Sequence, residues 1–119
     1  MPFFLAVYTM DPEDLARFRA MPKAEQEAVD ALGVSKWVEW EAANAASLPD
    51  RGGMVGRTKR VSKAGTADAI NPFCGYIIVE ADSIDAAACL FEEHPHFTIF
   101  PGSGVDIMPF LAGPASLDR

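Results

Sequence analysis

Two histidines separated by one proline carry the most versatile chemistry in the sequence. His94 and His96 flank Pro95, and two glutamates directly precede them. Histidine has an ordinary pKa close to neutrality, and a nearby carboxylate can orient its ring. We therefore predict His94 as a general acid/base, oriented by the catalytic carboxylate Asp106, with His96 as a ligand-binding residue. A structural interpretation stays open, in which His94 ends a helix and bonds to backbone carbonyls.

The histidines do not predict a metal site. Zinc accepts imidazole and carboxylate ligands, but the intervening proline and the lack of a second ligand cluster argue against it. The sequence also contains no glycine-rich phosphate loop, dinucleotide fingerprint, nucleophile elbow or set of zinc-binding cysteines. We predict no metal and no cofactor.

Four aromatic residues are candidates for a ligand pocket. Trp37 and Trp40 are three positions apart, so they are neighbours on a helix surface. Tyr8 and Tyr76 fall in two predicted strands and could present hydroxyl groups to a cleft. We predict these four as ligand-binding residues. The alternative is that they fill the core or an interface between subunits.

Composition narrows the class of protein. A formal net charge of −7 argues against binding to nucleic acid or to an anionic membrane surface. No run approaches the roughly 20 apolar residues of a membrane span, and the first residues lack the features of a signal peptide, so we expect a cytoplasmic protein. Cys74 and Cys89 are predicted to be small buried hydrophobic residues rather than a disulfide.

The second half of the chain predicts the elements that position the histidines. Residues 76–79 are β-branched or aromatic and indicate a strand. A helix follows, with Asp82 or Ser83 as its cap, and Pro95 is expected to stop it at His94. His94 would then lie at the carboxyl end of that helix. A glycine and proline turn leads to a final strand at residues 105–108.

The first half predicts a similar unit. Residues 3–9 indicate a strand, a short helix begins near Pro12, and a long helix runs from Lys23 to about Ser47, where Gly33 could interrupt it. A turn at residues 49–53 precedes a predicted strand at residues 54–61. That strand holds three cationic residues and fits a soluble edge strand better than an anion site. These residues are Arg57, Lys59 and Arg60.

The order of strand, helices, strand, strand, helix and strand predicts an α+β fold of ferredoxin-like split βαβ type. We expect a four-stranded antiparallel sheet with its helices on one face, in a single domain over residues 1–119 with an irregular tail at 110–119. Because both faces of the first strand are apolar, the second face needs a cover. A homodimer in the form of a dimeric α/β barrel would supply it.

Four stretches resemble the YCII-related family, also called YciI-like or DGPF-domain proteins, of the dimeric α/β-barrel superfamily. They are Trp-Val-Glu-Trp at 37–40, Asp-Arg-Gly-Gly-Met-Val-Gly-Arg-Thr-Lys at 50–59, the strand and helix start at 75–87, and His-Pro at 94–95 followed by Val-Asp-Ile-Met-Pro at 105–109. The resemblance implies a ferredoxin-like subunit, a homodimer and a cleft at the sheet face. Family members have been proposed as enzymes on the basis of a histidine and aspartate pair. Here no histidine precedes His94, and the Asp-Gly-Pro-Phe signature is absent.

Two functions follow from these observations. The first is binding of an unknown small molecule in the cleft, with acid/base catalysis by His94. The alternative is a non-catalytic homodimeric binding or accessory module. Fold likeness alone does not choose between them.

Overall fold

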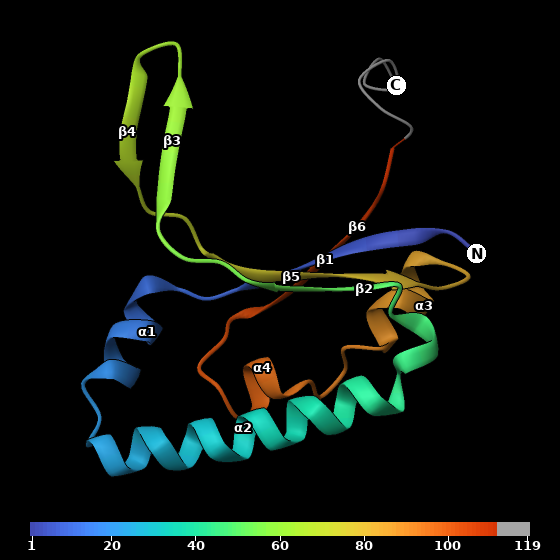
Figure 1. The fold of residues 1–119 in the computed structure, drawn as a ribbon, viewed down its shortest axis with the longest axis horizontal. Coiled ribbons are helices and arrows are strands. Elements are labelled where there is room, and N and C mark those ends of the chain that lie inside the picture. Colours follow the sequence, from blue (N-terminus) through green and yellow to red (C-terminus); the bar gives the residue numbers. More distant parts are fainter. Residues whose placement is uncertain (112–119) are drawn as a thin grey trace.

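A four-stranded antiparallel sheet forms the centre of the molecule (Figure 1). The computed structural model describes residues 1–111. Its sheet has the order β2-β5-β1-β6. This order of two split βαβ units confirms the predicted α+β, ferredoxin-like fold. The strands are β1 (Phe3–Thr9), β2 (Asp50–Met54), β5 (Phe73–Glu80) and β6 (Gly104–Pro109).

The helices all lie on one face of this sheet, as predicted (Figure 1). The long α2 crosses beneath the strands, and α4 lies between it and the sheet. No helix within residues 1–111 is long and apolar enough to cross a membrane. The helices are α1 (Pro12–Arg19), α2 (Lys23–Ala43), α3 (Ile84–Cys89) and α4 (Pro95–Thr98), with a 3-10 turn at Ala45–Ser47.

Strand alternation divides the sheet into a covered and an open face. Phe4, Ala6 and Tyr8 of β1 are buried beneath the helices with Ile77 and Val79 of β5. Their neighbours point the other way, because successive side chains in a strand alternate. By register, this open face carries Phe3, Leu5, Val7, Tyr76, Ile78, Met108 and the acids Asp50, Glu80 and Asp106.

The strand predicted at residues 54–61 is wrong in its bounds and its place. Most of the stretch at 49–53, which was expected to be a turn, belongs instead to β2 (Asp50–Met54) at the edge of the sheet. Gly52 has φ +59°, and a Cβ there would overlap the carbonyl of Tyr76. Only glycine tolerates this close approach of two backbones, so here the glycine marks an irregular edge strand rather than a turn.

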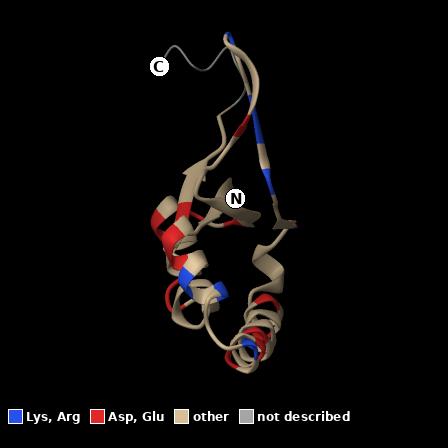
Figure 2. Cartoon of the chain, turned by 90° about the vertical axis from the view of Figure 1, so that its left-hand side faces the viewer, with Lys and Arg blue, Asp and Glu red and all other residues tan. Residues whose placement is uncertain are grey.

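The basic residues therefore lie outside the sheet. They belong to a separate hairpin of β3 (Thr58–Ser62) and β4 (Gly65–Ala69), which projects from the sheet on the side away from the helices (Figure 1). Its cationic residues contrast with the acidic helices (Figure 2). Residues 63 and 64 form the turn of this hairpin, between the paired Ser62 and Gly65.

Three local predictions for the second half of the chain have different outcomes. Ser83 caps α3 by accepting from the amide of Ala86 at 3.0 Å, as expected. The helix does not reach His94, because it ends at Cys89 and a turn with Glu93 at φ 60° follows. Cys89 is exposed and Cys74 is half-buried, so the expected burial of both was wrong.

Gly33 does not interrupt α2. It is a buried residue of the long helix, and the ring of Phe100 packs directly on it, where any Cβ would overlap that ring. Glycine is favoured at this position because it lets the loop that carries Phe100 approach the helix closely. That packing outweighs the low helix propensity of glycine.

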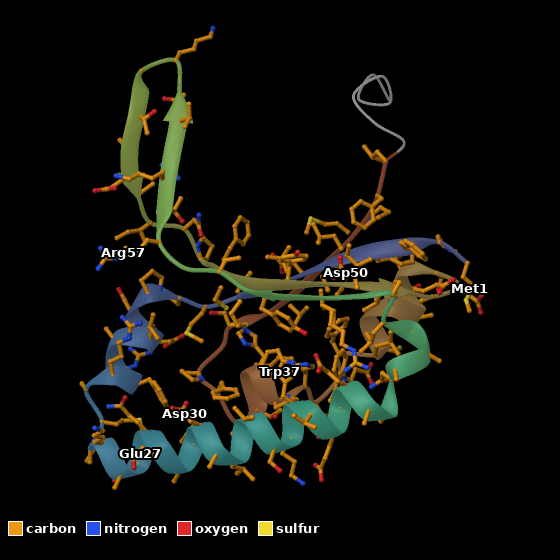
Figure 3. The ribbon with its side chains drawn as sticks, in the orientation of Figure 1. Met1, Glu27, Asp30, Trp37, Asp50 and Arg57 are labelled. Atoms are coloured by element: carbon orange, nitrogen blue, oxygen red, sulfur yellow. The ribbon has the colours of Figure 1, made fainter. Side chains whose placement is uncertain are left out.

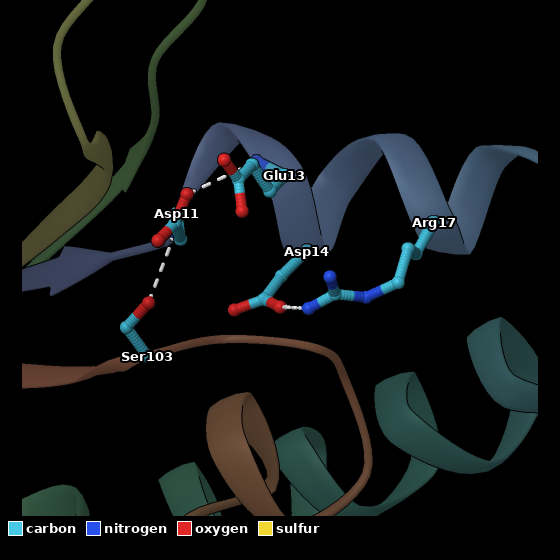
Figure 4. Close-up of polar contacts among 5 residues, drawn as sticks. All are labelled: Asp11, Glu13, Asp14, Arg17 and Ser103. Carbon is cyan, nitrogen blue, oxygen red and sulfur yellow. Dashed lines mark hydrogen bonds and ion pairs between the residues drawn. The ribbon is translucent and has the colours of Figure 1, made fainter.

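The start of α1 is tied to the loop before β6 (Figure 4). The carboxylate of Asp11 accepts from the amide of Glu13 at 3.0 Å and caps the helix, and the amide of Asp11 donates to Ser103 Oγ at 2.9 Å. Asp14 and Arg17 form an ion pair along the same helix. Of the tail expected to be irregular, residues 112–119 lie outside the described part of the chain.

Candidate functional site

A cavity of about 470 Å³ lies between α2 and the sheet, at the β2 edge. Its walls come from α2, the end of β1, β2 and the segment that contains α4. Trp37 projects from α2 into the space beneath the sheet (Figure 3). Apolar side chains dominate the walls, as in most small-molecule sites. The lining residues are Tyr8, Met10, Val34, Trp37, Val38, Glu41, Arg51, Gly52, Gly53, Met54, Tyr76, His96 and Phe100.

His96 brings an uncharged imidazole to this cavity. Its ring is 1% exposed, and Nε2 lies 2.7 Å from the carbonyl oxygen of Thr9. A carbonyl only accepts, so Nε2 carries the proton and Nδ1 is the ring's acceptor. No hydrogen bond among the described residues engages Nδ1. Burial lowers the pKa of His96, and the bond to Thr9 partly opposes that shift.

His94 lies behind His96, away from the cavity wall. It is fully buried and caps α4, with Nδ1 accepting from the amide of His96 at 3.0 Å. In the neutral ring Nε2 must then carry the proton, and this atom has no hydrogen-bond partner in residues 1–111. Burial, and secondarily the charge of His96, lower the pKa of His94 to about 4.

The predicted location of His94 at a helix carboxyl end is therefore wrong. That location would favour a charged ring, whereas the amino end of α4 favours a neutral acceptor. Aromatic rings enclose the imidazole: the centroids of Trp37, Trp40 and Tyr8 lie 4.5, 4.6 and 5.4 Å from its own.

Tyr8, which lines the cavity, has a buried hydroxyl group without a hydrogen-bond partner among residues 1–111. The side chain is 2% exposed, and its oxygen makes no hydrogen bond within residues 1–111. Burial raises the pKa of Tyr8, and the charges of Glu41 and Cys74 add to the effect. The hydroxyl is therefore protonated at neutral pH and can donate to a ligand.

The structure does not bring Asp106 to His94. Asp106 pairs with Val7 across the sheet, whereas Tyr8 and the histidines lie on the covered face. Tyr76 also pairs with Val7, so its side chain shares the open face although the residue borders the cavity. A shift of one residue along a strand moves a side chain to the opposite face of the sheet. The sequence pattern did not determine which residues of the neighbouring strands pair with each other.

The two tryptophans have separate environments. Trp37 lines the cavity, with its ring centroid 4.9 Å from that of Tyr8. Trp40 instead donates from Nε1 to the carbonyl of Leu90 at 2.7 Å and packs on Phe91, with centroids 5.1 Å apart. Of the predicted ligand-binding residues, Tyr8, Trp37, Tyr76 and His96 border the cavity, and Trp40 does not.

Sequence reasoning missed the charged pair of the cavity wall. Glu41 of α2 and Arg51 of β2 lie 3.6 Å apart between carboxylate and guanidinium. Glu41 follows Trp37 by four positions, so helical spacing could have placed the two side chains on one face. The position of Arg51 depended on recognising the edge strand. Phe100, which also lines the cavity, lies in a loop that has no periodic signal.

The titratable side chains do not form a cluster suited to a metal. Within residues 1–111, no group of three or more histidine, cysteine, aspartate or glutamate side chains is arranged to hold an ion.

Comparisons with known proteins bear on the fold. No family model matches the chain, and no curated protein does. A solved structure of 5-chloro-2-hydroxyhydroquinone dehydrochlorinase (TftG) from Burkholderia phenoliruptrix AC1100, in complex with 2,5-dihydroxybenzoquinone, superposes with a TM-score of 0.53 at 16% identity. The match covers 96% of this chain and 98% of that one. It supports the ferredoxin-like fold, while membership of the YCII-related family stays a prediction.

Proposed function

We propose that the cavity binds a small planar organic molecule that carries oxygen substituents. The observation behind this proposal is the pairing of an aromatic wall with an unpartnered buried hydroxyl group, that of Tyr8, and a free imidazole acceptor, that of His96. A buried polar group without a partner costs about 1–3 kcal/mol, and a ligand oxygen would relieve that cost.

The wall suits an aromatic or quinonoid ring. Trp37, Tyr8 and Phe100 offer flat faces and edges, and Met10 and Met54 supply adaptable contacts. Arg51 adds a cation for an acidic oxygen. The bound dihydroxybenzoquinone of the structural neighbour belongs to this chemical class, which supports the proposal without assigning the same reaction.

We further propose His96, rather than His94, as the group that accepts a proton from a bound ligand. A proton leaving an acidic O–H or C–H of the ligand would move to Nδ1, while Nε2–H stays bonded to the Thr9 carbonyl. That carbonyl would stabilise the resulting imidazolium. His94, which accepts from the His96 amide, would act as a positioning residue.

A second copy of the chain is the proposed partner. On the open face, Phe3 is 46%, Tyr76 38% and Met108 39% exposed, because neither a helix nor another strand within residues 1–111 covers that side. Apolar sheet faces are normally covered. This observation also favours the alternative function, a homodimeric binding module without catalysis.

Calorimetric titration with hydroxyquinones, phenols, aromatic acids and lactones tests the proposal. Wild type should bind one of these classes, and His96→Gln should weaken that binding because glutamine can still donate to Thr9 but lacks the imidazole acceptor. Lys36→Gln, on the exposed side of α2, is the matched surface control.

Binding that is equal in all three proteins would remove His96 from the site. No binding of any class to the wild type would remove the cavity proposal itself. A bound ligand that is never converted would favour the non-catalytic module.

A further inference from the structure

We propose that the hairpin of β3 and β4 is an arm that docks on the open sheet face of a second copy. The proposal rests on the partner inferred above and adds how that partner is recognised. It would make the contact reciprocal, because each chain carries both the arm and the face.

The hairpin lacks support of its own. Its two strands pair with each other from Thr58↔Ala69 to Ser62↔Gly65. Neither strand makes extensive contacts with another helix or strand of the described residues. A hydrogen bond from Asn71 Nδ2 to Thr58 Oγ1 at 2.9 Å closes the base. An isolated two-stranded hairpin is marginally stable in water, so a well-formed arm of this kind needs a surface to pack on.

Charge identifies the hairpin as distinct from the rest of the chain. Residues 55–72 hold four of the ten lysines and arginines but one of the seventeen acids. That acid, Asp68, already pairs with Lys59 at 2.5 Å. Arg57, Arg60 and Lys63 make no ion pair among the described residues. Val61 and Ile70 add apolar surface, at 77% and 81% exposure.

The open face has the opposite character. Its acids Asp50, Glu80 and Asp106 surround an apolar centre, and the described residues place no lysine or arginine on it. Glu80 lies 3.9 Å from the terminal amino group, and Asp50 accepts from the amide of Gly52 at 2.8 Å. Asp106 makes no ion pair in residues 1–111, so it is the acid most available to a partner.

The arm and the face lie on the same side of the sheet. The hairpin leaves the edge beside β2 and β5 and rises away from the helices, over the side that the helices leave uncovered (Figures 1 and 2). Two copies brought together through their open faces would each present a basic arm to the other's acidic face. Charge complementarity of this kind steers association and fixes orientation.

A charge-exchange experiment tests the arm. One variant, Arg60→Glu with Lys63→Glu, reverses the hairpin, and a second, Asp106→Lys, reverses the face. Sedimentation of the wild type should show a dimer, and each variant alone should dissociate about tenfold or more readily at low salt, because like charges then oppose each other. An equal mixture should restore a heterodimer, since both of its contacts are complementary again. Lys23→Glu with Lys36→Glu, on α2, changes the net charge equally and should dimerise as wild type does.

The outcomes separate the two proposals. If the wild type is a dimer and both charge variants dimerise equally well, the arm proposal is wrong while the proposed homodimer is supported. If the wild type is monomeric at every concentration, both the homodimer proposal and the arm proposal are wrong. Hairpin-dependent binding to duplex DNA or anionic vesicles, with dimerisation unaffected by the variants, would also overturn the arm and assign the basic residues to another partner.

Discussion

The backbone amide of His96 donates to Nδ1 of His94 at 3.0 Å. One histidine thereby fixes the tautomer of the other, and both rings are held uncharged beneath the sheet. The pair joins the cap of α4 to the cavity wall. A change at His94 should therefore affect the ligand site through His96, which lines the cavity.

Acid should destabilise the fold through these two rings. Both have a pKa below the ordinary 6.5 in the folded chain, so the unfolded chain binds more protons. Stability is then fully present above about pH 6.5 and falls as the pH drops toward the value of about 4 for His94. The lowered pKa of His94 corresponds to on the order of 3 kcal/mol of stability at neutral pH.

Urea unfolding between neutral pH and pH 4 measures this effect. His94→Asn keeps an acceptor at the cap position but does not titrate, so its free energy of unfolding should fall less steeply than that of the wild type. Parallel curves for the two proteins would show that the buried ring carries no such linkage.

Tyr8→Phe should separate stability from ligand binding. The hydroxyl is buried without a partner, so its removal should leave the free energy of unfolding unchanged or raise it by up to about 1 kcal/mol. Ligand affinity should fall about tenfold, the equivalent of one lost hydrogen bond. Thermal unfolding and calorimetric titration measure both quantities, and a clear loss of stability would indicate a hidden partner for the hydroxyl.

Gly33→Ala should destabilise the protein although alanine favours helices by about 1 kcal/mol. The new Cβ would overlap the ring of Phe100, which must move, and overpacking of this kind costs about 1–3 kcal/mol. Because Phe100 lines the cavity, ligand affinity should change too. Gly56→Ala, where a Cβ likewise meets nothing within 4 Å and which does not line the cavity, is the control for adding a methyl group at a glycine.

The sequence allowed the sheet to be predicted because its signals are local. Alternation in residues 3–9 and the β-branched run at 76–79 identified two central strands, and the order of elements then restricted the topology. The dehydrochlorinase structure has the same fold at low identity. The edge strand β2 escaped detection because its glycines are also typical of turns.

The site depended on long-range geometry that local signals do not contain. Asp106 was assigned to His94 because it lies on the next predicted strand, but its register with Val7 directs its side chain to the other face of the sheet. His94 was placed at the carboxyl end of the helix that follows Ser83, because Pro95 was expected to stop that helix there. The helix ends earlier, at Cys89, and His94 instead caps the amino end of α4. Glu41 and Arg51 meet only because β2 lies beside α2 at the cavity.

The two tryptophans offer a matched pair that tests the location of the site. Trp40→Phe removes the bond from Nε1 to the Leu90 carbonyl and should cost about 1 kcal/mol or more of stability, with little change in ligand affinity. Trp37→Phe removes no hydrogen bond known within residues 1–111 but shrinks the cavity wall, so affinity should fall several-fold with a smaller loss of stability. Urea unfolding and titration with the same ligand measure both effects in both variants. Because Trp37 and Trp40 are one turn apart and both contact His94, a general weakening of the core would affect them alike. The opposite pattern, with affinity lost only in Trp40→Phe, would move the ligand from this cavity to the other side of His94.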